Sequence, residues 1–288
     1  MTVVGIASGL GNGIFMLPTL TALKRLGHRI ALYVQQDFAT VALWRRCIYA
    51  DEILEPPLRS LEPVSRFAGQ RPMCGEWQPM AWRAIRNVQQ YKLRFPYRQS
   101  EWESDFRIAR TLGWSGPAPD VSDWCRDLDR SHRWDIGIVP GSKGGVWLRK
   151  RWPGMAAVAS HFKSRGERVA VFGLEGDGLE EIPGEFVDTR DIGKLPDALA
   201  GCRLIIGTDS GVTHLASSLG VPVVVIFTAT SELKGDPVGR LQRKIMRPMI
   251  CRPCQSSPRW QRCKDWQCRA IDPAEVIRAA EELRCKKS

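Results

Sequence analysis

The sequence of 288 residues has no long hydrophobic run, and this lack excludes an integral membrane protein. Its longest apolar segment, Val221–Phe227, is far shorter than the roughly 20 residues that a membrane-spanning helix needs. No basic region precedes the apolar stretch at residues 1–9, so we expect no secretory signal. These features predict a soluble protein of the cytoplasm.

Two common phosphate-binding motifs are also missing. The first glycine-rich loop does not match G-x-G-x-x-G, and no Gly-Lys-Ser/Thr ends a P-loop. The sequence therefore does not support NAD binding or NTP hydrolysis. Hydrophobic residues make up 43% and charged residues 25%, which is near the average of globular proteins and predicts a packed core.

Acidic residues are scarce relative to basic ones. The chain holds 42 Lys and Arg against 31 Asp and Glu, a net charge of +11. Residues 234–288 contain 14 basic and 6 acidic residues, a net of +8, which leaves +3 for the rest. Scattered basic residues are explained by solubility, but a basic C-terminal region predicts an anionic partner: phosphate, nucleic acid or the surface of an acidic membrane.

Short apolar segments alternate with segments of helical periodicity, a pattern that predicts an α/β fold with doubly wound parallel sheets. In the first half we expect strands at Val3–Ala7 and Ile30–Val34 and helices at Phe15–Leu26, Phe38–Cys47, Trp77–Tyr91 and Ser100–Leu112. In the second half we expect strands at Ile136–Val139, Arg168–Phe172, Leu204–Ile206 and Pro222–Phe227, and helices at Pro153–Arg165, Leu195–Ala200, Val212–Leu219 and Pro273–Leu283.

A loop rich in proline and aspartate at residues 116–122 precedes a new strand, which predicts a domain boundary near residues 128–133. We expect one domain at residues 1–130 and a second at residues 134–288. Ligands of such folds bind beyond the carboxyl ends of the strands, so function should reside in the loops that follow them, facing a cleft between the domains.

The loop at residues 207–216 carries the sharpest motif. It follows an apolar strand and opens a helix, so the backbone N–H groups at Ser210 and Gly211 suit a diphosphate. Asp209 is placed to bind sugar hydroxyls, and His214 lies one turn into the helix. The alternative is a helix cap, with Asp209 or Ser210 as the capping residue and His214 buried in the core.

Three further loops carry weaker signals. Residues 140–153 combine glycines with Ser142, Lys143 and Lys150, a composition that suits phosphate oxygens but equally suits a solvated basic loop. Glu175 follows a strand, where an acidic side chain can bind ribose hydroxyls. The glycine-rich turn at residues 9–13 should face the cleft from the other domain, with Gly11 and Gly13 allowing a ligand to approach closely.

Taken together, these segments resemble glycosyltransferase family 9, the heptosyltransferases. The resemblance is carried by Lys150-Arg-Trp-Pro153, by Asp209-Ser-Gly-x-x-His214-x-Ala216 with Gly220-Val-Pro222, and by the glycine-rich start followed by Leu17-Pro18. It implies a GT-B fold of two Rossmann-like domains facing a cleft. It also implies transfer of heptose from an ADP-sugar, with inversion and without a catalytic metal, to core sugars of lipopolysaccharide or, in some branches, to protein hydroxyls.

The resemblance assigns roles to individual residues. The domain at 1–130 is the acceptor side, and the domain at 134–288 binds the nucleotide sugar. Lys150 should touch the donor diphosphate, Glu175 the nucleoside and Asp209 the sugar. Residues around the phosphates are Gly11, Gly13, Ser142, Lys143, Ser210, Gly211 and His214.

Asn12 stands where the family has its general-base aspartate. An amide cannot accept a proton at neutral pH, and general-base help is typically worth about 10²–10⁴-fold in rate. Another carboxylate then serves, or the acceptor is already acidic, or the reaction has strong oxocarbenium character, or the chain is catalytically weak. The acceptor class is therefore not inherited from the family.

Four cysteines form a knuckle at residues 251–268, with the spacing Cys251-x2-Cys254-x8-Cys263-x4-Cys268. Four thiolates can hold a tetrahedral ion, and the first pair has the spacing of a structural zinc site. We predict a structural Zn or Fe ion, as the resemblance implies for some family members with similar inserts. The alternatives are four reduced thiols, or a basic, tryptophan-containing surface that contacts nucleic acid.

Two other functions remain open on the sequence alone. One is a glycosyltransferase that acts on nucleic acid, such as modified bases in DNA, which the basic C-terminal region favours. The other is a non-catalytic protein that binds a nucleotide sugar or nucleic acid, in which Asn12 marks lost activity.

Overall fold

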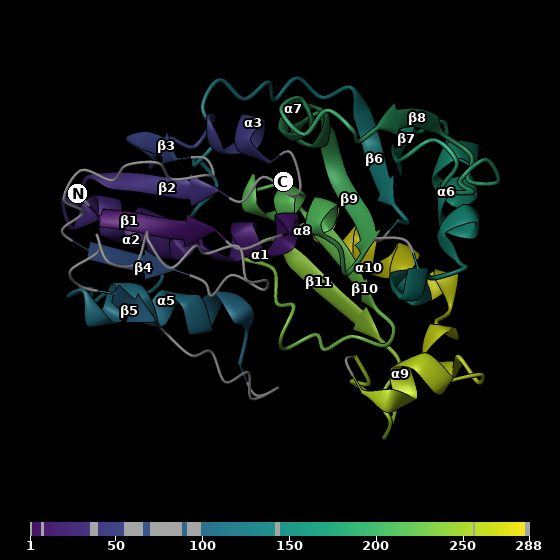
Figure 1. Cartoon of the computed structure of the whole chain (residues 1–288). Coiled ribbons are helices and arrows are strands. Elements are labelled where there is room, and N and C mark those ends of the chain that lie inside the picture. Colours follow the sequence, from purple (N-terminus) through teal and green to yellow (C-terminus); the bar gives the residue numbers. More distant parts are fainter. Residues whose placement is uncertain are drawn as a thin grey trace. The chain divides into compact units, whose positions relative to one another are not determined.

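The computed structural model of the chain divides into two compact units, Met1–Asp127 and Leu128–Ser288 (Figure 1). It describes residues 2–6, 9–34, 40–54, 66–69, 88–90, 99–141, 145–255 and 257–285. No helix within these ranges is long and apolar enough to cross a membrane.

The first unit contains a parallel sheet of five strands in the order β3-β2-β1-β4-β5. The strands are β1 (Thr2–Ile6), β2 (Ile30–Val34), β3 (Glu52–Leu54), β4 (Arg66–Gly69) and β5 (Val88–Gln90). Strands β1 and β2 are buried along their whole length, as expected of central strands whose two faces are both covered.

The described residues of the first unit include the helices α1 (Leu10–Phe15), α2 (Leu17–Arg25), α3 (Val41–Trp44) and α5 (Glu101–Thr111). The expected helix at Ser100–Leu112 is confirmed. Its start is fixed by a capping box, in which the Ser100 side chain accepts from the Glu103 backbone N–H and the Glu103 carboxylate accepts from Ser100. Gly27, with φ of +83°, follows the end of α2.

Of two further helices expected in the first unit, one is confirmed and one is wrong. The helix predicted at Phe15–Leu26 is α2 at Leu17–Arg25, with Pro18 in its first turn, and Phe15 ends the separate helix α1. The helix predicted at Trp77–Tyr91 is contradicted at residues 88–90, which form strand β5 beside β4. The rest of that predicted helix lies outside the described residues.

The second unit contains a parallel sheet of six strands in the order β11-β10-β9-β6-β7-β8. The strands are β6 (Trp134–Val139), β7 (Val169–Gly173), β8 (Glu185–Asp188), β9 (Cys202–Thr208), β10 (Val223–Phe227) and β11 (Gln242–Met246). The four predicted strands are β6, β7, β9 and β10. The sequence did not indicate β8 and β11, which are the two outer strands of the sheet.

Helices cover both faces of this second sheet. They are α6 (Met155–Ser164), α7 (Leu195–Ala200), α8 (Gly211–Ser218) and α10 (Pro273–Cys285). Helix α9 (Pro258–Arg262) contributes to a separate small cluster, and short 3-10 turns are η2 (Gly145–Lys150) and η3 (Gln267–Arg269). Side chains of α6 and α10 share one apolar core with Leu204 and Ile206 of β9. Helices α7 and α8 also contact β9 but contribute nothing to that core, so they cover the opposite face.

Candidate functional site

Three neighbouring strands of the second sheet, β6, β9 and β10, end at the same edge because they are parallel (Figure 1). Lys150 ends the turn η2 in the loop that follows β6. Asp209 directly follows β9, and Thr228 directly follows β10. The topology therefore brings Lys150 to one place with residues 59 and 78 positions further along the chain, as expected for the ligand edge of an open α/β sheet.

Asp209 is the centre of this edge. The Lys150 ammonium donates to Asp209 Oδ2 at 3.0 Å and to the Asp209 carbonyl oxygen at 3.1 Å. His214 Nε2 lies 2.9 Å from Asp209 Oδ1, so each carboxylate oxygen has its own partner. The sequence predicted all three residues for the site, and the structure brings them into one hydrogen-bonded network.

The network is largely shielded from water. Side-chain exposure is 14% for Lys150, 10% for Asp209 and 4% for His214. Burial alone would raise the pKa of Asp209, but the nearby Lys150 charge and the His214 hydrogen bond lower it further than burial raises it. The resulting pKa lies well below the ordinary aspartate range, so Asp209 is ionised at neutral pH.

Helix α8 begins beside this network. The Ser210 side chain accepts from the Thr213 backbone N–H at 3.4 Å and caps the helix. Ser210 and Gly211 are only partly buried, and N–H groups in the first turn have no partner within the helix. The structure thus shows the cap at Ser210 and a buried His214, and it pairs Asp209 with Lys150 and His214; the contacts with a diphosphate and a sugar stay a prediction.

A glycine is required where β9 meets α8. A Cβ atom at Gly207 would lie 2.9 Å from Val139 Cβ of the neighbouring strand and would also meet the Thr213 hydroxyl. That hydroxyl donates to the Thr208 carbonyl at 2.8 Å. Close approach of strand and helix at Gly207 therefore sets the position of the turn that carries Asp209.

Basic side chains of the loop after β6 make contacts within the protein, which its composition did not indicate. Arg149 donates to the Trp260 carbonyl and lies 5.0 Å from the centre of the Trp266 ring, while Arg151 pairs with Asp177 at 3.1 Å. Of these three consecutive cations, Lys150 is the one that bonds to Asp209. Ser142 and Lys143, predicted to bind the donor, lie outside the described residues.

Glu175 follows β7, the strand next to β6, as the sequence indicated. Its side chain is 83% exposed, and it forms a loose ion pair with Arg190 at 3.9 Å. It lies at the carboxyl edge of the same sheet as Lys150 and Asp209. The carboxylate is thus accessible to a ligand bound along that edge.

The glycine-rich segment of the first unit is not the loop that the sequence predicted. Gly11, Asn12 and Gly13 lie within helix α1, and the sharp turn falls at Gly9, with φ of +98°. A Cβ atom at Gly13 would lie 2.7 Å from the Trp44 ring, so this glycine serves close packing. Asn12 is half-buried and has an interaction partner of its own.

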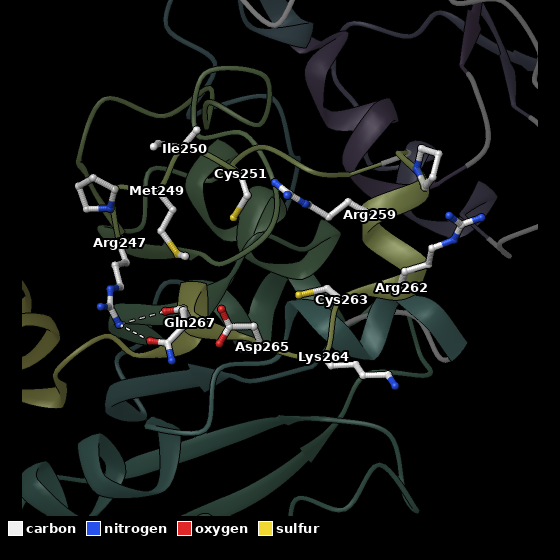
Figure 2. Close-up of a pocket in the computed structure, with 12 residues that line it drawn as sticks. Arg247, Met249, Ile250, Cys251, Arg259, Arg262, Cys263, Lys264, Asp265 and Gln267 are labelled. Atoms are coloured by element: carbon white, nitrogen blue, oxygen red, sulfur yellow. Dashed lines mark hydrogen bonds between the residues drawn. The ribbon is translucent and has the colours of Figure 1, made fainter.

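The four cysteines of the knuckle divide between a small apolar cluster and a pocket. In the part of the chain that the structure describes, no three Cys, His, Asp or Glu side chains are gathered closely enough to hold an ion. Cys254 and Cys268 are buried in a small apolar cluster with Trp260, whereas Cys251 and Cys263 line a pocket (Figure 2). The predicted structural Zn or Fe ion is therefore not shown by the arrangement of these side chains.

The knuckle nevertheless holds the loops of the candidate site. The guanidinium of Arg252, which is 5% exposed, donates to the carbonyls of Thr228 and Thr230 and pairs with Glu232. The Cys254 backbone N–H donates to the Ala229 carbonyl at 3.1 Å. The sequence placed Arg252 in the basic surface of the knuckle but did not indicate these contacts, because the carbonyls of Thr228 and Thr230 lie more than 20 positions away.

A family model matches most of the chain. The model of glycosyltransferase family 9 (heptosyltransferase) matches residues 59–264. Lipooligosaccharide heptosyltransferase 2 of Haemophilus ducreyi is 29% identical over 122 residues, which cover 36% of this chain and 34% of that protein. The chain thus spans about a third of the length of that curated relative.

Solved structures show the same fold. The family 9 glycosyl transferase of Veillonella parvula has a TM-score of 0.73 at 17% identity, covering 99% of this chain and 97% of that one. The ADP-heptose lps heptosyltransferase II of E. coli has a TM-score of 0.68 at 17% identity and 99% coverage of both chains. The iron-containing dodecameric glycosyltransferase TibC of enterotoxigenic E. coli has a TM-score of 0.62 at 16% identity, covering 100% of this chain and 76% of that one. The predicted fold class, two α/β units of the GT-B type, is confirmed.

Proposed function

Because the chain belongs to glycosyltransferase family 9, we propose that it transfers a heptose-like sugar from a nucleotide-diphosphate sugar to a hydroxyl acceptor. The observation that carries the proposal is the buried network of Lys150, Asp209 and His214 beside the start of α8. We favour an ADP-linked donor, because the E. coli heptosyltransferase II of the same fold is an ADP-heptose enzyme.

Lys150 and the first turn of α8 are the groups suited to a diphosphate. An ammonium group and the positive end of a helix both stabilise negative charge, and their effect is larger where water is excluded. In the proposed reaction the acceptor oxygen forms a bond to the anomeric carbon as the bond from that carbon to the diphosphate breaks. The departing oxygen takes the electron pair, and Lys150 stabilises the resulting charge. Attack opposite the leaving group inverts the anomeric centre.

Asp209 has two tasks in this proposal. Its ion pair holds the Lys150 ammonium at the edge of the sheet. In the proposed complex its carboxylate also accepts hydrogen bonds from donor-sugar hydroxyls. His214 fixes the orientation of the carboxylate by bonding Oδ1, which leaves Oδ2 to Lys150. The Asn12 amide cannot remove the proton of the acceptor hydroxyl, so another carboxylate does so or the acceptor is already acidic.

Binding of donor analogues tests this proposal. We expect titration calorimetry to detect ADP-sugars and to rank them above UDP- and GDP-sugars. Glu175→Ala should weaken ADP-sugar binding by about 10- to 100-fold, the typical value of a hydrogen bond to a charged group. The matched control is Glu180→Ala, an exposed glutamate on the same loop region. Absence of binding by every nucleotide sugar would refute the proposal.

We also propose that the four knuckle thiols hold a structural Zn or Fe ion. The support is their donor chemistry and their mutual repulsion: burial raises the pKa of Cys254 and Cys268, and the charges of the neighbouring cysteines raise both further. A bound cation would relieve this repulsion. TibC, which shares the fold, is iron-containing. When bound, the ion would cross-link residues 251–268 and take no part in sugar transfer.

Elemental analysis of the purified chain tests the metal proposal. We expect one Zn or Fe per chain, lost in Cys251→Ser and retained in Cys285→Ser, which alters an exposed cysteine outside the motif. A metal-free protein whose knuckle thiols react at once with a thiol reagent, with or without chelator, would contradict it.

A further inference from the structure

The knuckle forms a pocket that the proposed transfer reaction does not use. Residues 247–251, which follow strand β11, make one wall, and residues 258–267 make the other (Figure 2). The volume is about 950 Å³. Its lining combines a net positive charge with a fully exposed aliphatic side chain.

The charge of the lining is strongly positive. Four basic residues and one acidic residue line the pocket, a net of +3. Arg247 donates to the backbone and side-chain oxygens of Gln267, so its position is fixed. Arg259, Arg262 and Lys264 are exposed, and Figure 2 shows Arg262 and Lys264 extending away from the ribbon.

The apolar part lies on the facing wall. Ile250 is 107% exposed, the highest value among the large hydrophobic residues that the structure places on its surface. The adjacent Met249 packs against the apolar cluster of Cys254, Trp260 and Cys268, so the backbone beneath Ile250 is anchored. An aliphatic side chain held outward beside several cations is typical of segments that enter the interface of a bilayer.

We propose that this pocket and its rim dock the protein on an anionic lipid bilayer. Ile250 enters the boundary between headgroups and acyl chains, and Arg259, Arg262 and Lys264 contact lipid phosphates. The inference does not depend on the proposed transferase activity, because none of these four residues belongs to the network around Asp209.

The aromatic residues of the knuckle favour a lipid surface over nucleic acid. Binding of single strands relies on bases that stack on accessible rings. Trp260 is 5% exposed. Arg149 and Arg269 lie 5.0 and 5.7 Å from the centre of the Trp266 ring, so cations already cover that ring. An exposed isoleucine also has no role in holding a phosphate backbone, whereas a bilayer gives it an apolar environment.

Sedimentation of the whole chain with vesicles tests the inference. We expect binding to vesicles of phosphatidylcholine mixed with phosphatidylglycerol, little binding to phosphatidylcholine alone, and weaker binding as salt increases. Arg259→Glu, Arg262→Glu and Lys264→Glu combined should reduce the affinity at least about a hundredfold, since each basic residue near an anionic surface contributes about fivefold. Ile250→Glu should reduce it by about 10-fold or more.

Matched controls separate docking from general effects of charge and folding. Lys163→Glu on helix α6 makes the same charge change as Arg262→Glu on an exposed residue outside the knuckle. Phe186→Glu alters another exposed hydrophobic residue, 48% exposed, on β8 at the opposite edge of the sheet from β11. Both controls should bind vesicles like the unchanged protein, and thermal melts of all variants verify that they fold.

Three results would overturn the inference. The first is failure of the unchanged protein to bind anionic vesicles. The second is unchanged vesicle binding by both the triple charge variant and Ile250→Glu. The third is salt-dependent binding to DNA that the triple variant loses and Ile250→Glu retains, with binding to anionic vesicles no stronger than to phosphatidylcholine alone, which would assign the pocket to nucleic acid.

Discussion

Replacing Lys150 with alanine is expected to reduce the rate of sugar transfer by about 10²–10³-fold, the usual effect of removing one group that stabilises charge in the transition state. The side chain is 14% exposed and its ammonium group bonds to Asp209 at 3.0 Å, so it occupies a fixed position beside the start of α8. The loss should appear mainly in kcat, because the charge on the diphosphate oxygen grows as the bond to the sugar breaks. Steady-state kinetics with an ADP-sugar donor measure it.

A control variant tests whether the loss of activity is specific to Lys150. Lys163→Ala removes the same type of side chain from an exposed position on α6 and should leave both kinetic constants unchanged. Equal activity of Lys150→Ala and Lys163→Ala would show that the diphosphate binds elsewhere. A rise in KM with kcat unchanged would mean that Lys150 binds the ground state and the transition state equally.

The part of the site that could be predicted is the part where a strand is directly followed in sequence by a residue with a functional side chain. Asp209 follows a continuous apolar strand and opens a helix, so its place at the sheet edge follows from the sequence alone. The sequence did not predict which side chain binds each oxygen of the Asp209 carboxylate. The sequence left open a ligand site or a helix cap at Asp209 or Ser210. The hydrogen bond from the Thr213 backbone N–H shows the cap at Ser210, and Lys150, 59 residues away, binds Asp209.

The missed elements share a physical cause. Strand β11, Gln242–Met246, is an edge strand in which only Ile245 is buried, so its basic residues obscured the strand pattern. In the same way β8 begins with two exposed residues. The glycines at 11 and 13 resembled a ligand loop because close packing against an aromatic ring and close approach to a ligand both require a residue without a side chain.

The role of the cysteine knuckle also depends on contacts distant in sequence. Arg252 binds the carbonyls of residues 228 and 230, and Arg149 binds the carbonyl of Trp260. These contacts join the knuckle to the loops on either side of Asp209, because Arg149 precedes Lys150 and Thr230 lies beside the carboxylate. A pattern of cysteine spacing predicts a ligand set but gives no information about such side chain-to-backbone contacts.

Asp209→Asn is expected to lower the free energy of unfolding by about 3–5 kcal/mol at neutral pH, the typical result of removing one partner from a buried ion pair. The substitution keeps the size of the side chain but leaves the Lys150 ammonium, on a side chain that is 14% exposed, without its counter-charge. Urea unfolding of the whole chain measures the change. Asp135→Asn is the control: that carboxylate pairs with the exposed Arg168 and Arg203, and its loss should cost only about 1 kcal/mol.

The pH dependence of the difference in unfolding free energy between the unchanged protein and Asp209→Asn shows whether the charge of Asp209 causes that difference. The pKa of Asp209 is lowered in the folded protein, so the carboxylate stabilises the fold at any pH above its unfolded pKa, about 3.9. As pH falls below that value the unfolded state takes up a proton first, and the contribution declines until the folded pKa is reached. The gap between the unchanged protein and Asp209→Asn should therefore be constant from neutral pH to about pH 5 and should narrow below about pH 4. A gap that stays constant to lower pH, or one no larger than that of Asp135→Asn, would mean that Asp209 stabilises the fold through its shape and hydrogen bonds and that the Lys150 pair contributes little.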